Sequence, residues 1–267
     1  MGNMINSDIR RTILSMVNKG CASHIGSAFS MVEILNAIYK SVDVKKILTH
    51  DNDRDRVILS KGHGTSGLYA VMHHHGLLSD GDIDSYFLNG TILAGHASHF
   101  IDTVEHSTGA LGHGLPVGLG IAIGSSSKNY NNRVYVVVGD GELHEGSNWE
   151  AIMYAGHHKA SNLCVLVDKN ERSQMGRTKD ACSLDPLPEK FLAFNFEVHE
   201  LKDGHDEAKL IDIISKTKKS LKPVAIICNT IKGKGVSFME GDNLWHYKPP
   251  VEDNFINAMK ELGGNVE

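Results

Sequence analysis

The chain has 267 residues, of which 41% are hydrophobic and 22% are charged, as in a globular protein with one large core. Its formal net charge of −5 gives no basic field for a phosphate backbone, which excludes nucleic acid as an expected partner. The longest apolar stretch, residues 115–124, is too short to cross a bilayer, and the N-terminus lacks a signal-peptide core. We therefore expect a cytoplasmic protein without a membrane anchor.

Helical patterns open and close the chain. Residues 8–20 and 30–42 are predicted as two amphipathic helices, the second capped by Ser30 with Glu33 completing a capping box. Residues 205–220 repeat apolar side chains at helical spacing, and a last short helix is expected from residue 252 onward. The apolar face of the 205–220 helix comprises Leu210, Ile213, Ile214 and Leu221.

Four short runs rich in β-branched residues lie between these helical patterns. They occupy residues 56–60, 133–138, 163–167 and 224–231. Between the second and the third run, residues 146–160 place Trp149, Ile152, Met153 and Ala155 at helical spacing. Apolar strands that alternate with helices predict an α/β fold of three layers, with a mostly parallel sheet covered by helices on both faces. Because no repeat or linker interrupts the chain, residues 1–267 are expected to form a single domain.

Glycine recurs in one further helical segment. Gly114, Gly118, Gly120 and Gly124 allow this segment to pack unusually close to a neighbour. That neighbour can belong to the same domain or to another subunit, and the sequence favours neither.

Cysteine and histidine give no sign of a zinc site. Cys21, Cys164, Cys182 and Cys228 form no CxxC pair, so we interpret them as structural. The run 73–75 contains three histidines, but adjacent residues on a helix point to different faces. We therefore interpret that run as helix surface.

Polar, glycine-rich segments follow each predicted strand. They read KGHGTSG, GDGELHEG, DKNERSQMG and IKGKGVSF. Ligands of open parallel sheets bind beyond the carboxyl ends of the strands. The sequence therefore places its candidate site at that edge.

Asp140 and Asn170 follow two consecutive strands, and a right-handed crossover would bring them together. A carboxylate, an amide oxygen and a backbone carbonyl suit Mg²⁺ or Ca²⁺ better than zinc. The glycines beside Asp140 let the backbone approach a bulky anion, and the helix expected after it aims free N–H groups there. GDG alone fits a simple turn, but its pairing with Asn170 indicates a metal site.

Two more loops favour a phosphate ligand. His63 lies between Gly62 and Gly64 at an expected helix start, where its imidazole can donate to a phosphate oxygen. Residues 106–114 form another loop of small side chains. Because the GK[ST] sequence of a P-loop is missing, a nucleotide triphosphatase is disfavoured. Together these loops describe a site for a metal-bridged diphosphate among histidines.

The chain resembles the N-terminal, diphosphate-binding part of transketolases over nearly its whole length. The similarity is carried, in order, by SHIGSAFSMVEIL, DRVILSKGHGTSGLYA, AGHASH, STGALGHG, GDGELHEGSNWEA, VDKNERSQMG and IKGKGVSFME with its following WH. The resemblance implies thiamine diphosphate bound through Mg²⁺, with Ca²⁺ or Mn²⁺ as substitutes.

The resemblance also assigns roles to residues. The metal ligands of the family are matched by Asp140, Asn170 and the carbonyl of Arg172. The positions at the diphosphate are matched by His63 and Gly141. The loop along the middle and the pyrimidine of the cofactor is matched by Gly109, Ala110 and Leu111. Glu145 matches a glutamate that links the two sites of such dimers. His24, His96 and His246 match histidines that line the substrate channel, where imidazoles can bond sugar hydroxyls and move protons. His113 stands where many relatives have glutamine, and His99 and His106 have weaker claims.

Several positions depart from the family pattern. Ile25, Ala97 and Ala110 replace prolines, and Tyr247 stands where glycine is common after His246. Metal ligands and glycines are unaffected, so cofactor binding is expected to survive, whereas the identity of the substrate is open: pentose phosphates or a more specialised sugar.

In this family a catalytic glutamate lies in a second, pyrimidine-binding domain, which this sequence does not show. The resemblance therefore implies the first subunit of a split transketolase. It would form an α2β2 heterotetramer with a C-terminal transketolase subunit and move a two-carbon ketol unit from a ketose to an aldose. Two alternatives are the α subunit of a 2-oxo acid dehydrogenase and a catalytically silent scaffold subunit. The LSKGHG segment and the histidines argue against the first, and the retained Asp140 and Asn170 argue against the second.

Overall fold

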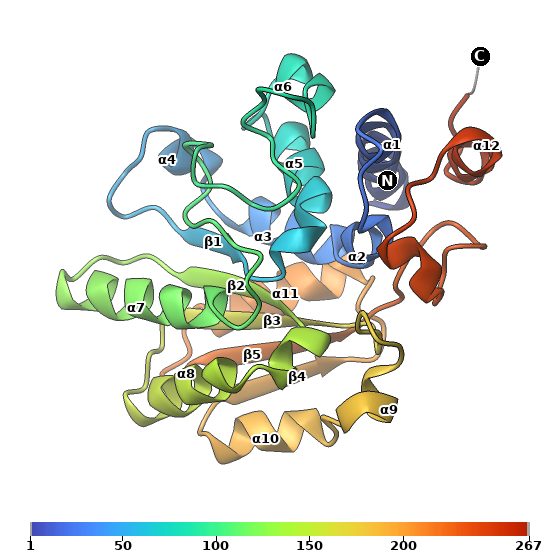
Figure 1. Cartoon of the computed structure of the whole chain (residues 1–267). Helices are drawn as coiled ribbons and strands as arrows, with labels where there is room; N and C mark the ends of the chain where they lie inside the picture. Colours follow the sequence, from blue (N-terminus) through green and yellow to red (C-terminus); the bar gives the residue numbers. More distant parts are fainter. Residues whose placement is uncertain (1, 266–267) are drawn as a thin grey trace.

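The computed structural model describes residues 2–265 and is built on one parallel five-stranded sheet (Figure 1). Its strands are β1 (Arg56–Leu59), β2 (Val134–Gly139), β3 (Leu163–Lys169), β4 (Glu197–Leu201) and β5 (Val224–Asn229). They lie in the order β1-β2-β3-β5-β4, and every neighbouring pair is parallel. The predicted parallel α/β fold is confirmed, and all four predicted strands are present.

Helices cover both faces of the sheet because the side chains of each strand alternate between two cores. Along β2, Tyr135 and Val137 pack into one core, and Val134, Val136 and Val138 pack into the other. The first core is covered by α1 (Gly2–Lys19), α2 (Ile25–Ser30), α3 (Val32–Ser41), α5 (Thr65–His74) and α11 (Glu207–Thr217). The second is covered by α7 (Gly114–Ser127), α8 (Gly146–His157) and α10 (Leu187–Ala193).

Shorter elements complete the described chain. They are the helices α4 (Val44–Leu48), α6 (Asp80–Asp84), α9 (Thr178–Cys182) and α12 (Glu252–Glu261), and the 3₁₀ turns η1 (Gly62–Gly64), η2 (Gly141–His144) and η3 (Asn243–His246). Within residues 2–265, none of the helices has the length and hydrophobicity needed to cross a membrane.

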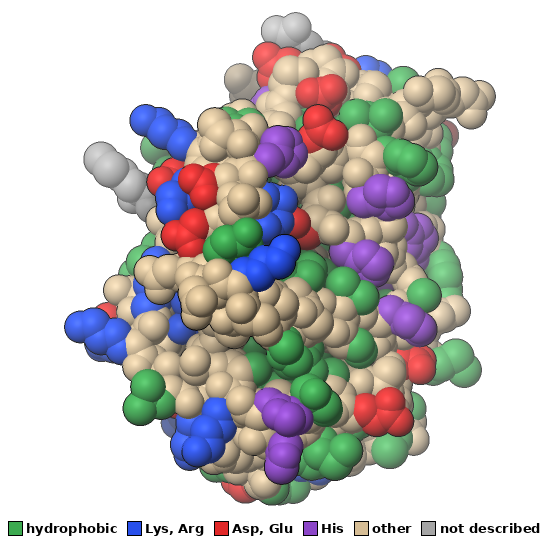
Figure 2. Space-filling model, turned by 90° about the vertical axis from the view of Figure 1, so that its left-hand side faces the viewer, with side chains coloured by type: hydrophobic (Ala, Val, Ile, Leu, Met, Phe, Trp, Pro, Cys, Tyr) green, Lys and Arg blue, Asp and Glu red, His purple; other side chains and the backbone are tan. Residues whose placement is uncertain are grey.

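On the face shown in Figure 2, acidic and basic side chains are interspersed.

Three expectations about individual elements are wrong. Ser30 is the last residue of α2 rather than the cap of α3, because its hydroxyl donates to Asp168 and to the carbonyl of Ser27. Glu33 pairs with Arg10 instead of closing a capping box. Leu221 lies beyond the end of α11 and is 84% exposed.

The edge strand β4 was not predicted from the sequence. Its residues read EVHEL, and most of them are only partly buried because β4 has a partner on one side alone. An edge strand can keep charged side chains, so its apolar signal is weak.

The glycines of α7 divide between two faces. A side chain at Gly118 would lie 2.5 Å from Val136, and one at Gly114 would lie 2.4 Å from the Ser60 hydroxyl. These two glycines therefore allow close packing within the chain. A Cβ atom added at Gly120 or Gly124 would have no atom of the described residues within 4 Å, so these two glycines face outward. Whether this outward face packs against another subunit stays open.

Candidate active site

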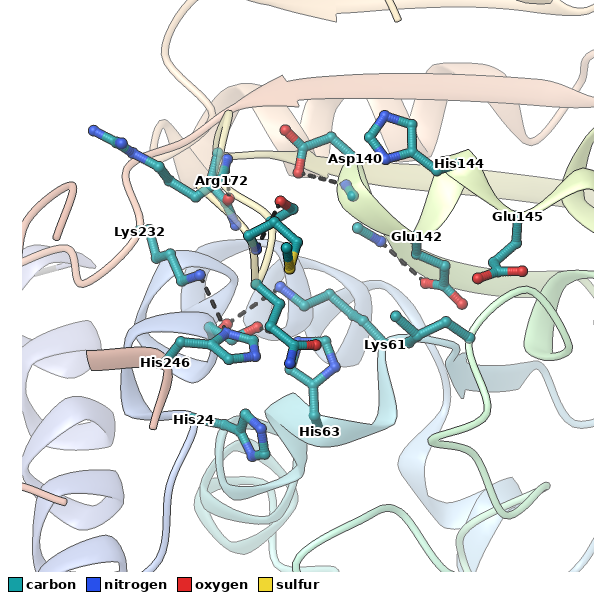
Figure 3. Close-up of a pocket in the computed structure, with 18 of the residues that line it drawn as sticks. His24, Lys61, His63, Asp140, Glu142, His144, Glu145, Arg172, Lys232 and His246 are labelled. Carbon is teal, nitrogen blue, oxygen red and sulfur yellow. Dashed lines mark hydrogen bonds between the residues drawn. The ribbon is translucent and has the colours of Figure 1, made fainter. Parts of the chain in front are cut away.

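One pocket of about 440 Å³ lies at the carboxyl edge of the sheet. Its walls come from the loops after β1, β2, β3 and β5, together with η3 and the start of α2 (Figure 3). This is the edge at which ligands of parallel sheets bind. The pocket contains residues from nearly every motif singled out in the sequence.

Asp140 follows β2 directly and is 3% exposed. Its carboxylate accepts a hydrogen bond from the N–H of Gly141 at 2.9 Å and a long one from the Thr178 hydroxyl at 3.3 Å. Burial, and then the negative charge of Asp168, raise the pKa of Asp140 to about 7. The N–H of Glu171 also lowers its pKa, but among the described residues no cation lies within salt-bridge distance of Asp140, so its charge is poorly balanced by the protein around it.

Asn170 and Arg172 supply further oxygens on the same side of the pocket. The Oδ1 atom of Asn170 accepts one hydrogen bond, from the N–H of Arg172 at 3.1 Å, so a second lone pair stays available. The Arg172 carbonyl lies 3.9 Å from the position of a side chain added at Gly141. A carboxylate, an amide oxygen and a carbonyl thus border one small volume, an oxygen-only set that fits Mg²⁺.

Beneath these residues, Asp168 at the end of β3 has a full set of donors. Lys61 forms a buried ion pair with it, Thr230 donates to it, and Ser30 and Asn170 donate at 2.6 Å and 3.0 Å. Burial alone would raise the pKa of Asp168, but Lys61 and the donors bring it below its usual value. This junction therefore holds the Asn170 amide in place.

Four histidines converge on the opposite wall. The ring centroids of His24 and His246 are 4.8 Å apart, those of His63 and His246 are 5.5 Å apart, and those of His24 and His96 are 5.9 Å apart. His24 adopts a left-handed backbone conformation with φ 72°, and its N–H donates to the carbonyl of His246. The three histidines that the family resemblance assigns to the substrate channel, His24, His96 and His246, are thus neighbours.

Burial lowers the pKa of all four histidines and so favours the neutral imidazole. Burial, together with nearby cationic groups, lowers the pKa of His24 to about 4 and that of His246 to about 3. Burial also lowers the pKa of His63 well below its usual value, and its Nε2 lies 2.9 Å from the Ser27 hydroxyl. Neutral imidazoles both donate and accept hydrogen bonds, as sugar hydroxyls require.

Lys232 brings a second cation into the pocket. Its ammonium lies 3.2 Å from Nδ1 of His246 (Figure 3), and burial followed by repulsion from Lys61 lowers its pKa to about 8. Unlike Lys61, it has no carboxylate within salt-bridge distance among the described residues. An anionic ligand in the pocket would supply the missing counter-charge.

The glycine loop (residues 108–113) closes one end of the pocket. Gly109 has φ 142°, and a side chain there would lie 2.7 Å from the His96 ring, which explains why the position needs glycine. Gly109 and Leu111 line the pocket, whereas Ala110 is exposed and does not. Its predicted contact with the cofactor stays a prediction.

The remaining candidates lie at the rim or outside. Glu145 borders the pocket at the start of α8 and is exposed, on the far side of Glu142 from His24 and His246 (Figure 3). His113 is exposed and contacts the carbonyl of Leu111, and His99 bonds Ser107. Neither of these histidines, nor His106, lines the pocket.

Sequence reasoning missed several pocket residues. Lys61, Lys232 and Glu142 stand inside the motifs LSKGHG, IKGKG and GDGELHEG, yet received no role. Their signal was a charged residue two or three positions after the end of an apolar strand, close to the signal that selected Asp140. Residues 73–75 do not converge on one point, since His73 lies beside Asp80 and His75 beside the buried Asn36. Their interpretation as helix surface fits the exposed His74 but not His75, which follows the end of α5 and is partly buried.

A family model described as "Transketolase, thiamine diphosphate binding domain" matches residues 2–267. The chain belongs to this transketolase family. It is 40% identical to one of the subunits of apulose-4-phosphate transketolase from Actinobacillus succinogenes, covering 95% of this chain and 93% of that protein. It is 34% identical to the 6-deoxy-6-sulfo-D-fructose transketolase subunit SqwG of a Clostridium species, with the same coverage.

Solved transketolases share the fold. The crystal structure of transketolase from Campylobacter jejuni superposes with a TM-score of 0.89 at 28% identity, covering 99% of this chain and 43% of that one. The chain thus spans less than half the length of that transketolase. The resemblance to transketolases, the fold and the transferase class predicted from the sequence are confirmed.

Proposed function

We propose that this chain is the cofactor-binding subunit of a two-subunit transketolase, which moves a two-carbon ketol unit from a ketose to an aldose. One observation carries the proposal. Within the described part of the chain, Asp140, a buried carboxylate without a cationic partner, shares a pocket with Lys232, an ammonium without a carboxylate partner, and with neutral histidines. Metal, diphosphate and sugar hydroxyls are the ligands that these three features fit. The transketolase family membership supports the same conclusion.

Asp140, Asn170 and the Arg172 carbonyl would hold Mg²⁺, for which Ca²⁺ or Mn²⁺ can substitute. When bound, thiamine diphosphate supplies a thiazolium that stabilises carbanions. Gly141, His63 and Lys232 would bind its diphosphate, with Gly109, Ala110 and Leu111 along its remaining length.

His24, His96 and His246 would face the sugar. With a pKa of about 4 and about 3, the imidazoles of His24 and His246 orient hydroxyl groups by hydrogen bonding and accept protons only weakly. A bound diphosphate would raise these pKa values, because a nearby negative charge favours the imidazolium. The histidines would then become better proton carriers once the cofactor is in place.

A partner chain completes the proposal. Three relatives, each matched over more than nine-tenths of its length, are named as subunits. We propose a C-terminal transketolase subunit that carries the pyrimidine-binding domain and the catalytic glutamate, joined in a cytoplasmic α2β2 heterotetramer. In such an assembly Glu145 would face the neighbouring site.

The test is an assay of the chain co-purified with its partner, Mg²⁺ and thiamine diphosphate. Ketose donors would include xylulose 5-phosphate, apulose 4-phosphate and 6-deoxy-6-sulfofructose, each with an aldose acceptor, and pyruvate would be the competing donor. Ketol transfer from a ketose is expected. Turnover of pyruvate alone would favour the 2-oxo acid dehydrogenase alternative, and absence of cofactor binding would favour a silent scaffold subunit.

A further inference from the structure

A second buried carboxylate, that of Glu142, lies in η2 only two residues after Asp140. It is 2% exposed and has no place in the steps described above. Burying a carboxylate is costly unless specific donors surround it. The partners of Glu142 therefore indicate what it does.

Three donors from three different segments converge on this carboxylate. The Ser60 hydroxyl, just after β1, donates to Oε1 at 2.5 Å, and the N–H of Gly112 donates to the same atom at 3.1 Å. The N–H of Gly139, the last residue of β2, donates to Oε2 at 3.2 Å. One side chain thus joins the ends of two strands to the glycine loop.

The peptide of Gly112 is held from its other side as well. The Ser147 hydroxyl, in the first turn of α8, donates to the Gly112 carbonyl at 2.7 Å. Gly112 has φ 85°, and a side chain there would lie 2.6 Å from Cβ of Glu145. The glycine loop therefore cannot move relative to the segment 139–147 without breaking the hydrogen bonds of Glu142 or Ser147.

We propose that Glu142 is a positioning residue that sets the separation between the glycine loop and the Asp140 loop, so that both contact one bound thiamine diphosphate. The inference rests on the proposed function, because it assigns the two loops to a single ligand. In this role Glu142 acts through the two loops that it joins, because its carboxylate is occupied by donors of the chain.

All three neighbours of the carboxylate are donors, which makes the residue type specific. Glutamine has the same shape, but in either orientation its NH₂ group would face the N–H of Gly112 or that of Gly139 and leave a buried backbone donor unsatisfied. Aspartate keeps the charge but is one methylene too short to reach Ser60, Gly112 and Gly139 together. Glu142→Gln thus tests the hydrogen bonds, and Glu142→Asp tests the reach.

The experiment measures thiamine diphosphate affinity by calorimetry in excess Mg²⁺, using the chain co-purified with its partner. A matched control is Glu207→Gln, since Glu207 in α11 is also largely buried and accepts from Asn6, Asn36 and Lys40. Glu142→Gln is expected to raise the Kd about tenfold, while Glu207→Gln leaves it within about twofold. Equal Kd values for Glu142→Gln and the unsubstituted chain would overturn the proposal.

Hydrogen exchange without cofactor gives a readout that does not depend on binding. In Glu142→Gln, and in the milder Ser60→Ala and Ser147→Ala, faster exchange is expected in a peptide covering 108–114, with β3 and β5 unchanged. Uniformly faster exchange over the whole chain, or none at 108–114, would overturn the positioning role. If the unsubstituted chain fails to bind thiamine diphosphate, the proposed function falls, and exchange at 108–114 still decides whether Glu142 holds the loop.

Discussion

Asp140 and Asp168 stand at the carboxyl ends of neighbouring strands, and both are almost fully buried. Asp168 has a lysine and three further donors, and its pKa is low; Asp140 has one short hydrogen bond, and its pKa is raised to about 7. Burial is the same, so the difference lies in the donors. A buried carboxylate whose charge is compensated by a cation and several donors stabilises the fold, whereas one without such compensation indicates a binding site for a cation or another ligand.

The largest expected effect concerns the compensated carboxylate. Asp168→Asn leaves Lys61 buried without a counter-charge and should lower the free energy of unfolding by about 3–5 kcal/mol, measured by urea denaturation. The double variant Lys61→Met, Asp168→Asn should recover part of this loss because it removes the unpaired charge. If the free energy of unfolding of Asp168→Asn fell by less than about 1 kcal/mol, the Lys61–Asp168 ion pair would not be the stabilising contact that distinguishes Asp168 from Asp140.

The same substitution at the uncompensated carboxylate should act on binding instead. Asp140→Asn should leave the stability of the ligand-free chain unchanged or slightly higher, because it removes a poorly compensated buried charge. Its affinity for thiamine diphosphate with Mg²⁺ should fall at least about 100-fold, about 2.7 kcal/mol, by calorimetry. Asp212→Asn, at an exposed pair with Lys216, is the control; unchanged affinity in Asp140→Asn would remove Asp140 from the site.

The contrast extends to the lysines, since Lys61 is paired and Lys232 is not. Lys232→Met should weaken binding of thiamine diphosphate about tenfold but leave binding of unphosphorylated thiamine nearly unchanged. Lys234→Met, two residues later and paired with Glu240, should alter neither. Equal losses for thiamine and thiamine diphosphate would show that Lys232 does not recognise the phosphates.

A smaller effect is expected from pH. Because the folded-state pKa of His246 is about 3 and its ordinary value is 6.5, the unfolded chain binds the proton first, and stability falls as pH drops below 6.5 towards 3. The raised pKa of Asp140 has the opposite effect, since it makes the folded chain more stable as pH falls. The contribution of His246 is therefore measured by comparing the chain with and without this imidazole.

His246→Asn should therefore show a shallower loss of unfolding free energy between pH 7 and pH 5 than the unsubstituted chain, in urea titrations at both values. His113→Asn, at an exposed position, should not change the slope. An identical slope in His246→Asn would show that the imidazole is not desolvated.

Much of the fold followed from the sequence, because β1, β2, β3 and β5 combine apolar runs with glycine-rich ends. β4 escaped because its charged residues sit at a sheet edge. In the candidate site, Asp140, Asn170 and His63 were selected from their motifs and the three substrate-channel histidines through the family resemblance, and all of them line the same pocket. The roles of Lys61 and Glu142 were not, because each depends on partners that only the folded chain brings near. Ser30 shows the reverse error, where a local capping pattern was overridden by a distant carboxylate.

The hydrogen bond from the N–H of His24 to the carbonyl of His246 joins segments from opposite ends of the described chain. During synthesis, a ribosome would release the first histidine long before it makes the second. The histidine-lined wall of the pocket would thus be completed only after η3 has emerged. Long-range contacts of this kind form late in folding, so a nascent chain could build most of its sheet before its active site exists.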